Sequence, residues 1–572
     1  MRSSNRPRLA QRWQAERAAA AAQARHDRER RRLLGGAGLL TLGLAGAWMG
    51  IGSAPAAGLT QGAGGAAVSH AFSARIDPQA LGAPVNRRLL GHNVQWVDRG
   101  DDLLREDGSF EPRMLDRVLA LGPTALRFPG GAQSDLYHWQ RGIGPLAQRG
   151  DNEHFHARTR QPSVMGSAEF LALCEATGAE PLITVNLPSG SPEEAARWVH
   201  ATNVVGFTSP RTGQRLPRVP CWEIGNEPYL KDEAQPALAL EPEAFAHRAD
   251  AFIRAMRAVD PAIRIGLPLS NAQRNGVPVV HFRDWLGRVL RTQRERIDFA
   301  SVHNAYLPYA QELADDSPAN RATAYWAAMA GARTVQADLD ALGATLAALR
   351  PGPALPLALT EYHALFSLGH GARDDWVGSA AGALYVADLL RLLAGRPEML
   401  MAHLWSLSGN WRFGAIHSAG FDRPVAQVLA LMNQALRGRL VAASMQSPTV
   451  ATRAAGLVAA QPALPLIETL ATLETVRGAA TLRVLLIHKD PQRPASGRID
   501  IAGMAAGPAR LTRLAATDVL RSDDVPDLLR SERLDLPAPG AAALTVILPP
   551  ASISLLELPL VALPPAPRVS TA

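Results

Sequence analysis

The amino-acid sequence predicts an α/β protein: a (β/α)8 TIM barrel with a C-terminal β-sandwich domain, preceded by an N-terminal transmembrane or signal segment. Three observations lead to this fold class. Eight short apolar runs alternate with helix-period segments between residues 86 and 430, the order that a barrel of parallel strands requires. After residue 430 the helical pattern gives way to short β-type runs separated by Pro and Gly. An uncharged apolar stretch at 33–57 follows a basic N-terminus.

These changes in pattern divide the chain into six segments. They are a basic cytoplasmic tail at 1–32, a transmembrane anchor or signal segment at 33–57, a linker plus a strand that joins the sandwich at 58–85, the barrel at 86–430, the sandwich at 431–562 and a tail at 563–572.

The N-terminal tail accounts for the charge of the chain. Residues 1–32 contain ten arginines and three acidic residues, so they carry the whole net charge of +7, and the rest of the chain is balanced. A neutral folded body offers no basic surface for a phosphate backbone. Nucleic acid is therefore not expected as a partner.

The apolar segment at 33–57 is long enough to cross a bilayer, and the positive-inside rule would keep the arginine tail in the cytoplasm. Three interpretations remain open: an uncleaved anchor, a cleaved signal ending near Ala54-Pro55-Ala56, and a twin-arginine signal at Arg31-Arg32. All three place the body in the cell envelope of a bacterium, anchored in the inner membrane with the membrane as a partner, or exported.

The barrel is predicted from alternating apolar runs and helical segments. The expected strands are 89–96, 125–128, 181–186, 221–225, 264–269, 297–303, 357–360 and 399–405. The expected helices include 112–121, 167–177, 192–202, 242–259, 280–292, 323–349 and 378–393.

The strand-rich C-terminal region is predicted from short runs with β-type composition. The runs are 464–473, 481–488, 497–501, 509–514, 544–548 and 553–558. The alternating segment 70–76 is expected to join the same sandwich, which would place the barrel between sandwich strands.

Polar side chains end or follow most of the predicted barrel strands. Because the carboxyl ends of parallel strands meet at one mouth of a barrel, these residues are expected to share a site. They are Asn93, Arg127, Asn186, Asn226, Glu227, His303, Tyr306, Glu361 and Trp405.

Two carboxylates among them point to a reaction. Glu227 follows the apolar strand 221–225, and Glu361 follows the apolar strand 357–360. Cleavage of a glycosidic bond needs two such groups, one to protonate the leaving oxygen and one to attack or stabilise the sugar cation. Glu223 lies within the strand 221–225, and its side chain points the other way from the catalytic candidate Glu227. It is therefore expected to be an inward structural carboxylate.

No metal or other cofactor is expected. The sequence lacks zinc-type Cys/His spacing, and the pair His154 and His156 is interpreted as surface or substrate-lining. Cys174 and Cys221 are interpreted as buried free thiols, with a disulfide between them left open.

The segments 126–131, 137–139 and 142–145 resemble the second-strand region of the family 51 α-L-arabinofuranosidases, in the clan of (β/α)8 retaining glycoside hydrolases. The segments 222–228 and 360–362 resemble the clan's acid/base and nucleophile motifs. After the second Glu this chain has Tyr362 and His363 where that family usually has Trp and Asn. The sugar therefore stays open, and the heparanase-like β-glucuronidases are a second candidate.

This resemblance implies roles for the site residues. Glu227 would be the general acid/base and Glu361 the nucleophile, held ionised by Arg127, with carboxyl groups ~5–5.5 Å apart. Asn226 would bind the sugar hydroxyl beside the anomeric carbon. The remaining expectations are that Tyr306 or His303 orients Glu361, that Trp405 is a platform for a sugar face, and that Asn186 and Asn93 contact substrate.

The predicted function is retaining glycoside hydrolysis of an arabinofuranosidase-like kind, on a polysaccharide or oligosaccharide. Alternatives left open are a uronic-acid-directed or endo-acting glycosidase or transglycosylase on the same barrel, and a non-catalytic envelope protein that binds glycans. The sequence predicts no oligomeric state.

Overall fold

The computed structural model describes residues 69–230, 238–270, 282, 284–303, 305–310, 313, 317–365, 376–502, 505–522, 524–526, 528–538 and 543–561. The basic tail at 1–32, the apolar segment at 33–57 and the tail at 563–572 lie outside these ranges. Within them, no helix has the length and apolar character needed to span a bilayer.

Eight parallel strands close into a barrel. Each strand pairs with the next in the series, and the last pairs with the first, so the ring has no free edge. The strands are β2 (Gly91–Asn93), β3 (Ala125–Phe128), β6 (Glu180–Val185), β7 (Cys221–Ile224), β8 (Arg264–Pro268), β9 (Phe299–Val302), β11 (Leu357–Leu365) and β12 (Met399–Leu404). The predicted barrel is confirmed, and each of its strands overlaps the corresponding predicted run.

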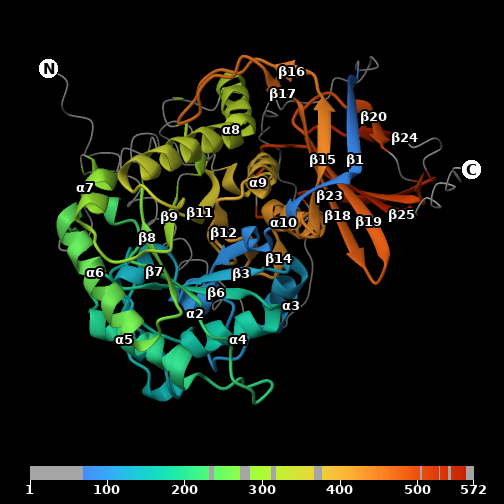
Figure 1. Ribbon diagram of the computed structural model, residues 1–572. Helices are drawn as coiled ribbons and strands as arrows, with labels where there is room; N and C mark the ends of the chain where they lie inside the picture. The colour runs from blue at the N-terminus through green and yellow to red at the C-terminus, as the bar shows by residue number, and fades with distance from the viewer. Residues whose placement is uncertain are drawn as a thin grey trace, which may run out of the picture.

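Helices surround the barrel (Figure 1). They are α3 (Pro112–Leu121), α4 (Ser167–Thr177), α5 (Pro192–Val199), α6 (Pro242–Val259), α7 (Trp285–Thr292), α8 (Pro318–Leu349), α9 (Ala380–Ala394) and α10 (Pro424–Ala435). Five of these helices begin with Pro, which loses no intrahelical hydrogen bond at the first position. The predicted helix 192–202 is α-helical as far as Val199 and wrong in its last three residues, because the chain winds into a π-helix at His200–Val205. The sequence analysis missed α10.

Short elements connect the main ones. Tyr306–Pro308 forms β10, which extends the barrel sheet by pairing with the end of β11. The others are α2 (Val97–Asp101), β4 (Asp151–Glu153), β5 (Arg160–Pro162), β13 (Ile416–His417), β14 (Phe421–Asp422), β16 (Thr449–Val450), β17 (Leu464–Pro465) and the 3-10 turns at 87–89, 131–136, 139–142, 146–148, 228–230 and 376–378.

The C-terminal part is rich in strands, as predicted, and it forms one continuous sheet. The strand order is β23-β22-β25-β19-β18-β15-β1-β20-β24, with β21 beside β25. The bounds are β1 (His70–Pro84), β15 (Arg439–Gln446), β18 (Ile467–Val476), β19 (Ala479–His488), β20 (Ala495–Ile501), β21 (Ala505–Ala506), β22 (Ala509–Ala515), β23 (Arg530–Leu536), β24 (Ala543–Leu548) and β25 (Ser552–Val561). The early strand therefore sits between β15 and β20.

Alternation along these strands divides their apolar side chains between two cores. On β19, Val484 and Leu486 join a cluster shared by strands from both ends of the sheet. Leu485 and Ile487 face the other way and join the cluster that contains the barrel helices. The sheet is thus fixed against the barrel, and it also encloses a core of its own.

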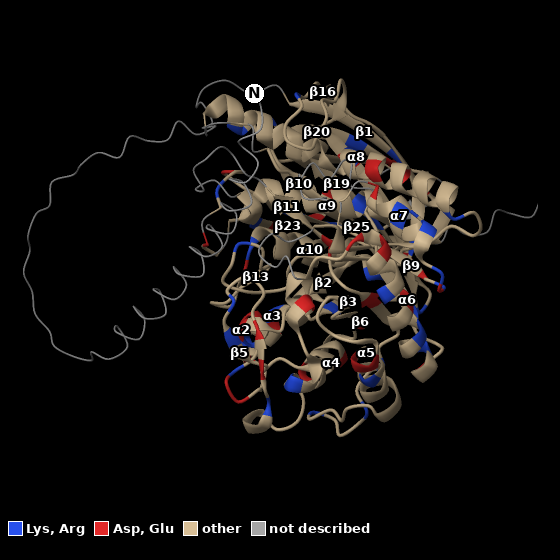
Figure 2. Ribbon diagram, turned by 90° about the vertical axis from the view of Figure 1, so that its left-hand side faces the viewer, with Lys and Arg blue, Asp and Glu red and all other residues tan. Residues whose placement is uncertain are grey.

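The fold buries both cysteines and leaves charges of both signs on the surface of the described part. Cys174 and Cys221 are both buried and free, which confirms the preferred interpretation of the two cysteines. Figure 2 shows acidic and basic positions interspersed over the helices of the described part.

Candidate active site

Arg127 is the hub of the polar residues inside the barrel. It lies on β3 and is completely buried. Its Nε donates to Oε2 of Glu223 at 2.7 Å, and its Nη1 donates to Oε1 of Glu361 at 2.9 Å. Nη1 also donates to Oδ1 of Asn93 and Nη2 to Oδ1 of Asn226, both at 2.8 Å. One guanidinium thus fixes the side chains of three predicted site residues, Asn93, Asn226 and Glu361, and that of Glu223.

Glu361 is held at both carboxylate oxygens. Oε1 accepts from Arg127, and Oε2 accepts from the Tyr306 hydroxyl at 2.8 Å. The pairing of β10 with β11 brings Tyr306 beside this part of the chain. Burial raises the pKa of the Tyr306 hydroxyl well above its ordinary value, and the nearby Glu361 carboxylate raises it further. Tyr306 therefore remains a proton donor to the Glu361 carboxylate.

Glu227 lies just beyond β7 on a strained loop. Its backbone φ is +41°, and φ of Gly225, two residues earlier, is +78°. A non-glycine residue in this left-handed region costs of order 1–3 kcal/mol, and such residues gather at functional sites. The side chain of Glu227 is 23% exposed, whereas that of Glu361 is 6% exposed. The turn therefore presents Glu227 to solvent while Glu361 stays in the barrel mouth.

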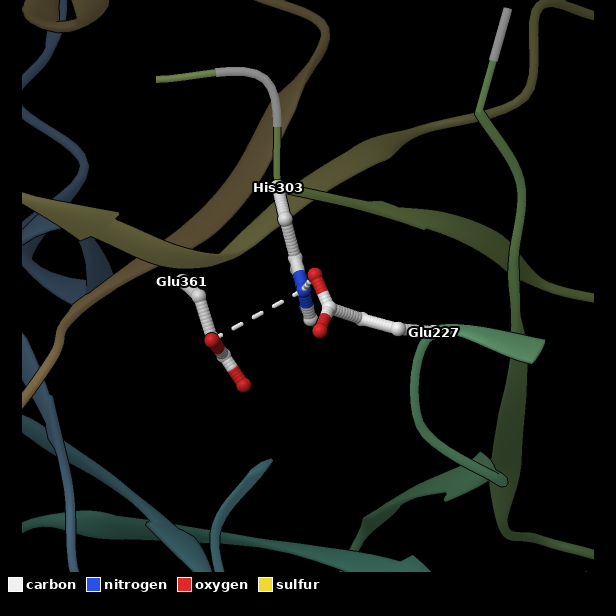
Figure 3. Close-up of side chains that lie close together, drawn as sticks. All are labelled: Glu227, His303 and Glu361. Carbon is white, nitrogen blue, oxygen red and sulfur yellow. Dashed lines mark hydrogen bonds and ion pairs between the residues drawn. The ribbon is translucent and has the colours of Figure 1, made fainter. Parts of the chain in front are cut away.

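His303 lies between the two glutamates (Figure 3). Its Nδ1 is 2.9 Å from Oε1 of Glu227 and 3.8 Å from Oε2 of Glu361. One donor atom from each of the three residues lies within 4.8 Å of the other two. Burial lowers the pKa of His303, but the Glu361 and Glu227 carboxylates outweigh burial and raise it above its ordinary value. The three side chains can therefore hold and exchange a proton.

The same three residues carry donor atoms that suit a cation. However, Arg127 places a fixed positive charge 2.9 Å from Glu361, and Tyr306 and His303 occupy carboxylate oxygens of the pair. The donor set is thus better suited to acid/base chemistry than to binding a metal ion.

Asn93 and Asn186 form hydrogen bonds with other groups of the protein. Asn93 is fully buried, accepts from Arg127 and donates to the backbone oxygens of Thr360 and Leu404. Asn186 accepts through Oδ1 from the backbone N–H groups of Ser189 and Gly190. Both residues organise the mouth of the barrel, and their contact with substrate stays a prediction.

Trp405 directly follows β12 and lies in an aromatic cluster. It is 7% exposed and meets Trp411 edge to face, with ring centroids 5.5 Å apart. A Cβ at Gly131, where φ is +53°, would lie 2.4 Å from the Trp405 ring. Only glycine permits this packing, which fixes the indole at the barrel mouth. Its role as a sugar platform stays a prediction.

The sequence analysis missed Thr184 and Thr360. Both donate to Glu223, Thr184 to Oε2 at 2.6 Å and Thr360 to Oε1 at 3.0 Å. Thr360 also lies 2.9 Å from Nε2 of His303. Glu223 is fully buried, in agreement with the inward structural carboxylate that was expected. A hydroxyl residue within an otherwise apolar run was the available signal for the two threonines.

A cavity that opens to solvent adjoins Glu227. Apart from Glu227, Asn226 and Asp135, the described residues around it are largely apolar. Its wall includes Phe155, Leu187, Pro188, Leu230, Leu238 and Leu240.

Part of the barrel matches a known protein domain. Residues 117–298 match the model of the Alpha-L-arabinofuranosidase 1 domain, a region that includes Arg127 and Glu227. The probable α-L-arabinofuranosidase C of Aspergillus flavus is 30% identical over 172 residues, which are 29% of this chain and 33% of that protein. The intracellular exo-α-(1→5)-L-arabinofuranosidase of Streptomyces lividans is 27% identical over 254 residues, 41% of this chain and 37% of that protein. The chain thus matches about a third of the length of these relatives.

Solved structures share the fold over most of the chain. The family 51 α-L-arabinofuranosidase of Thermotoga petrophila superposes with a TM-score of 0.70 at 21% identity, covering 85% of this chain and 99% of that one. A family 51 enzyme from Bifidobacterium longum gives 0.70 at 23% identity, covering 86% and 100%. A family 44 xyloglucanase from Paenibacillus polymyxa gives 0.57 at 14%, covering 86% and 100%. These structures show the shared fold, and the domain match at 117–298 with the curated relatives confirms the resemblance to arabinofuranosidases.

Proposed function

We propose that this chain is a retaining glycoside hydrolase of arabinofuranosidase-like specificity, with Glu361 as nucleophile and Glu227 as general acid/base. The observation that carries the proposal is the approach of the two carboxylates, which have oxygens within 4.8 Å of each other. Retaining glycosidases hold their carboxyl groups ~5–5.5 Å apart, whereas inverting ones leave ~6.5–9.5 Å for a water molecule. The domain match over 117–298 supports the choice of sugar.

The two displacements follow from the partners of each carboxylate. Glu361, ionised beside Arg127 and Tyr306, attacks the anomeric carbon as the glycosidic C–O bond breaks and Glu227 protonates the leaving oxygen. Glu227 then takes a proton from water, whose oxygen attacks the anomeric carbon. The bond from sugar to Glu361 breaks, which restores both carboxyl groups.

The remaining contacts suggest how the substrate lies. Arg127 binds Oδ1 of Asn226 and so fixes its amide, whose Nδ2 is proposed to donate to the hydroxyl beside the anomeric carbon. The leaving group is proposed to occupy the cavity next to Glu227, because the acid must reach the leaving oxygen. Its largely apolar wall favours a leaving group with an apolar face.

A neutral sugar is favoured over a uronic acid. All three nitrogens of the Arg127 guanidinium donate to protein acceptors. The central cation among the described residues is thus already paired and is not offered to a substrate carboxylate.

A panel of aryl glycosides tests the function. The arabinofuranoside should be hydrolysed faster than the xyloside, glucuronide, glucoside and galactoside, and Glu361→Ala should abolish that turnover. Turnover of the glucuronide alone would support the uronic-acid alternative. Cleavage of polysaccharide without any aryl glycoside would support endo action. Glycan binding without turnover, unchanged in Glu227→Ala and Glu361→Ala, would contradict an enzymatic function.

Export or membrane anchoring remains part of the proposal. It rests on the sequence of 33–57 alone, and the Streptomyces relative is named as intracellular. Membrane fractionation with N-terminal sequencing distinguishes an anchored chain from a cleaved one. Full-length protein in the cytoplasmic fraction would contradict both.

A further inference from the structure

A hydrogen-bonded chain links buried Glu223 to Glu227 through two intermediates. Oε1 of Glu223 is 3.0 Å from Oγ1 of Thr360, and that oxygen is 2.9 Å from Nε2 of His303. The other ring nitrogen, Nδ1, is 2.9 Å from Oε1 of Glu227. This hydrogen-bonded chain runs from Glu223 on β7 to Thr360 on β11 and then to His303, just after β9. It ends at Glu227 in the loop after β7.

The direction of each hydrogen bond follows from the charge on Glu223. Burial raises the pKa of its carboxyl, but Arg127 at 2.7 Å, His303 and the hydrogen bond from Thr184 together outweigh burial and hold the pKa below its ordinary value. An ionised carboxylate only accepts, so the single hydroxyl proton of Thr360 points to Glu223. The Thr360 oxygen can then only accept from His303, which requires a proton on Nε2.

We infer that Glu223 is a positioning residue for the acid/base: acting through Thr360, it fixes one proton of His303 on Nε2 and leaves Nδ1 to share a second proton with Glu227. The inference rests on the proposed function, in which Glu227 supplies a proton to the leaving group. The bond between Nδ1 and Oε1 needs one proton, carried by Glu227 or by the imidazole. That proton goes to the leaving oxygen and is replaced when water is deprotonated, while the proton on Nε2 stays in place throughout.

Loss of the hydrogen bonds between Glu223, Thr360 and His303 would remove the constraint that places the second proton between His303 and Glu227. If Thr360 no longer donates to Glu223, the neutral imidazole is free to carry its proton on Nδ1, and Glu227 must then be ionised to accept it.

The charged and titratable groups around the pair of His303 and Glu227 lie on several elements. They are Glu361, Glu223, Arg127, Tyr306, Tyr229, Asp135 and His403.

Two threonines offer a matched test. Thr360→Val removes the hydroxyl that links Glu223 to His303. Thr184→Val removes a similar hydroxyl that donates to the other oxygen of Glu223, Oε2, and so lies outside the path to His303. We expect the basic limb of kcat/KM against pH to move about one unit lower in Thr360→Val and to stay in place in Thr184→Val. Glu223→Gln should move it in the same direction as Thr360→Val, provided that thermal unfolding shows a folded protein.

Equal basic limbs in the two threonine variants would overturn the inference. A second measurement does not depend on turnover. In full-length protein labelled with ¹⁵N-histidine, and with His303→Gln for assignment, the imidazole signal of His303 should show a protonated Nε2 in the wild type and in Thr184→Val, and a changed protonation pattern in Thr360→Val. An unprotonated Nε2 in the wild type refutes the positioning role even if glycosides are hydrolysed. Absence of turnover with a protonated Nε2 refutes the proposed function alone.

Discussion

Arg127 and Glu361 are 234 residues apart in the sequence, yet Nη1 of Arg127 donates to Oε1 of Glu361 across 2.9 Å. The same guanidinium also binds Glu223, so one buried cation serves two buried carboxylates. One guanidinium beside two carboxylates leaves one negative charge uncompensated. The other neighbours of Glu361 suit this negative charge. Tyr306 donates to that carboxylate, and His303 has a raised pKa beside it.

Arg127→Lys should damage both activity and stability. A lysine ammonium cannot reproduce the planar fork that reaches Glu223, Glu361 and the two asparagines. Buried acceptors without a partner cost about 1–3 kcal/mol each, so the free energy of unfolding should fall by at least that amount. Turnover of the best aryl glycoside should fall about 100-fold or more.

Urea unfolding and steady-state kinetics check this prediction. Arg254→Lys is the control, because Arg254 is 60% exposed in its ion pair with Glu295, and surface changes of this kind stay within about 0.5 kcal/mol. Equal effects of the two substitutions would contradict the central role of Arg127.

Glu227→Ala should slow hydrolysis according to the leaving group. A general acid contributes about 10²–10⁴-fold where the leaving oxygen needs a proton. We expect a loss of that size for an alkyl glycoside and a much smaller loss in the first step for a dinitrophenyl glycoside, which leaves without protonation. Pre-steady-state bursts measure that step.

Glu361→Ala is the comparison for this prediction. It removes the nucleophile, so both substrates should lose at least about 10⁴-fold. A loss in Glu227→Ala that is the same for both leaving groups would contradict its assignment as the acid.

Much of the barrel could be predicted because local signals coincide with its element boundaries. Helix α3 was predicted at its observed bounds, since Pro112 begins it and Gly122, with φ of +67°, ends it. Strand β23 was missed because its residues are mostly exposed and do not alternate between apolar and polar. The π-helix after Val199 changes the hydrogen-bond spacing without interrupting the helical periodicity that predicted a single helix.

The site was predictable where chemistry follows a strand end. Glu227 and Glu361 each follow an apolar run, and Arg127 ends another. The contacts of Thr360 were beyond prediction, because they depend on which side chains meet across the closed barrel. For the same reason Asn93 and Asn186 stood out as polar residues at strand ends, although their hydrogen bonds run to the protein.

The pKa of Glu223 predicts a pH-dependent stability. Its folded-state pKa lies below the ordinary 4.5, so the unfolded chain binds more protons in the acid range. The stabilising contribution is complete above about pH 4.5 and is lost as pH falls through the folded pKa. Glu223→Gln should therefore reduce the slope of unfolding free energy against pH between about 3 and 5.

Urea titrations across this range measure the slope. Glu532→Gln is the control, because Glu532 is 56% exposed in its ion pair with Arg513 and should leave the slope unchanged. Parallel slopes for wild type and Glu223→Gln would contradict an ionised, paired Glu223.

The distance between the glutamates predicts the stereochemical outcome. With carboxylate oxygens within 4.8 Å, there is no room for a water molecule between Glu361 and the anomeric carbon, so the sugar must first bond to Glu361. Hydrolysis in the presence of methanol should then yield the methyl glycoside with the configuration of the substrate. Trapping with methanol is needed because the free sugar mutarotates, and proton NMR of the early product reads the configuration directly. Glu361→Ala should give no methyl glycoside, and an inverted product from the wild type would show that water, rather than Glu361, attacks first.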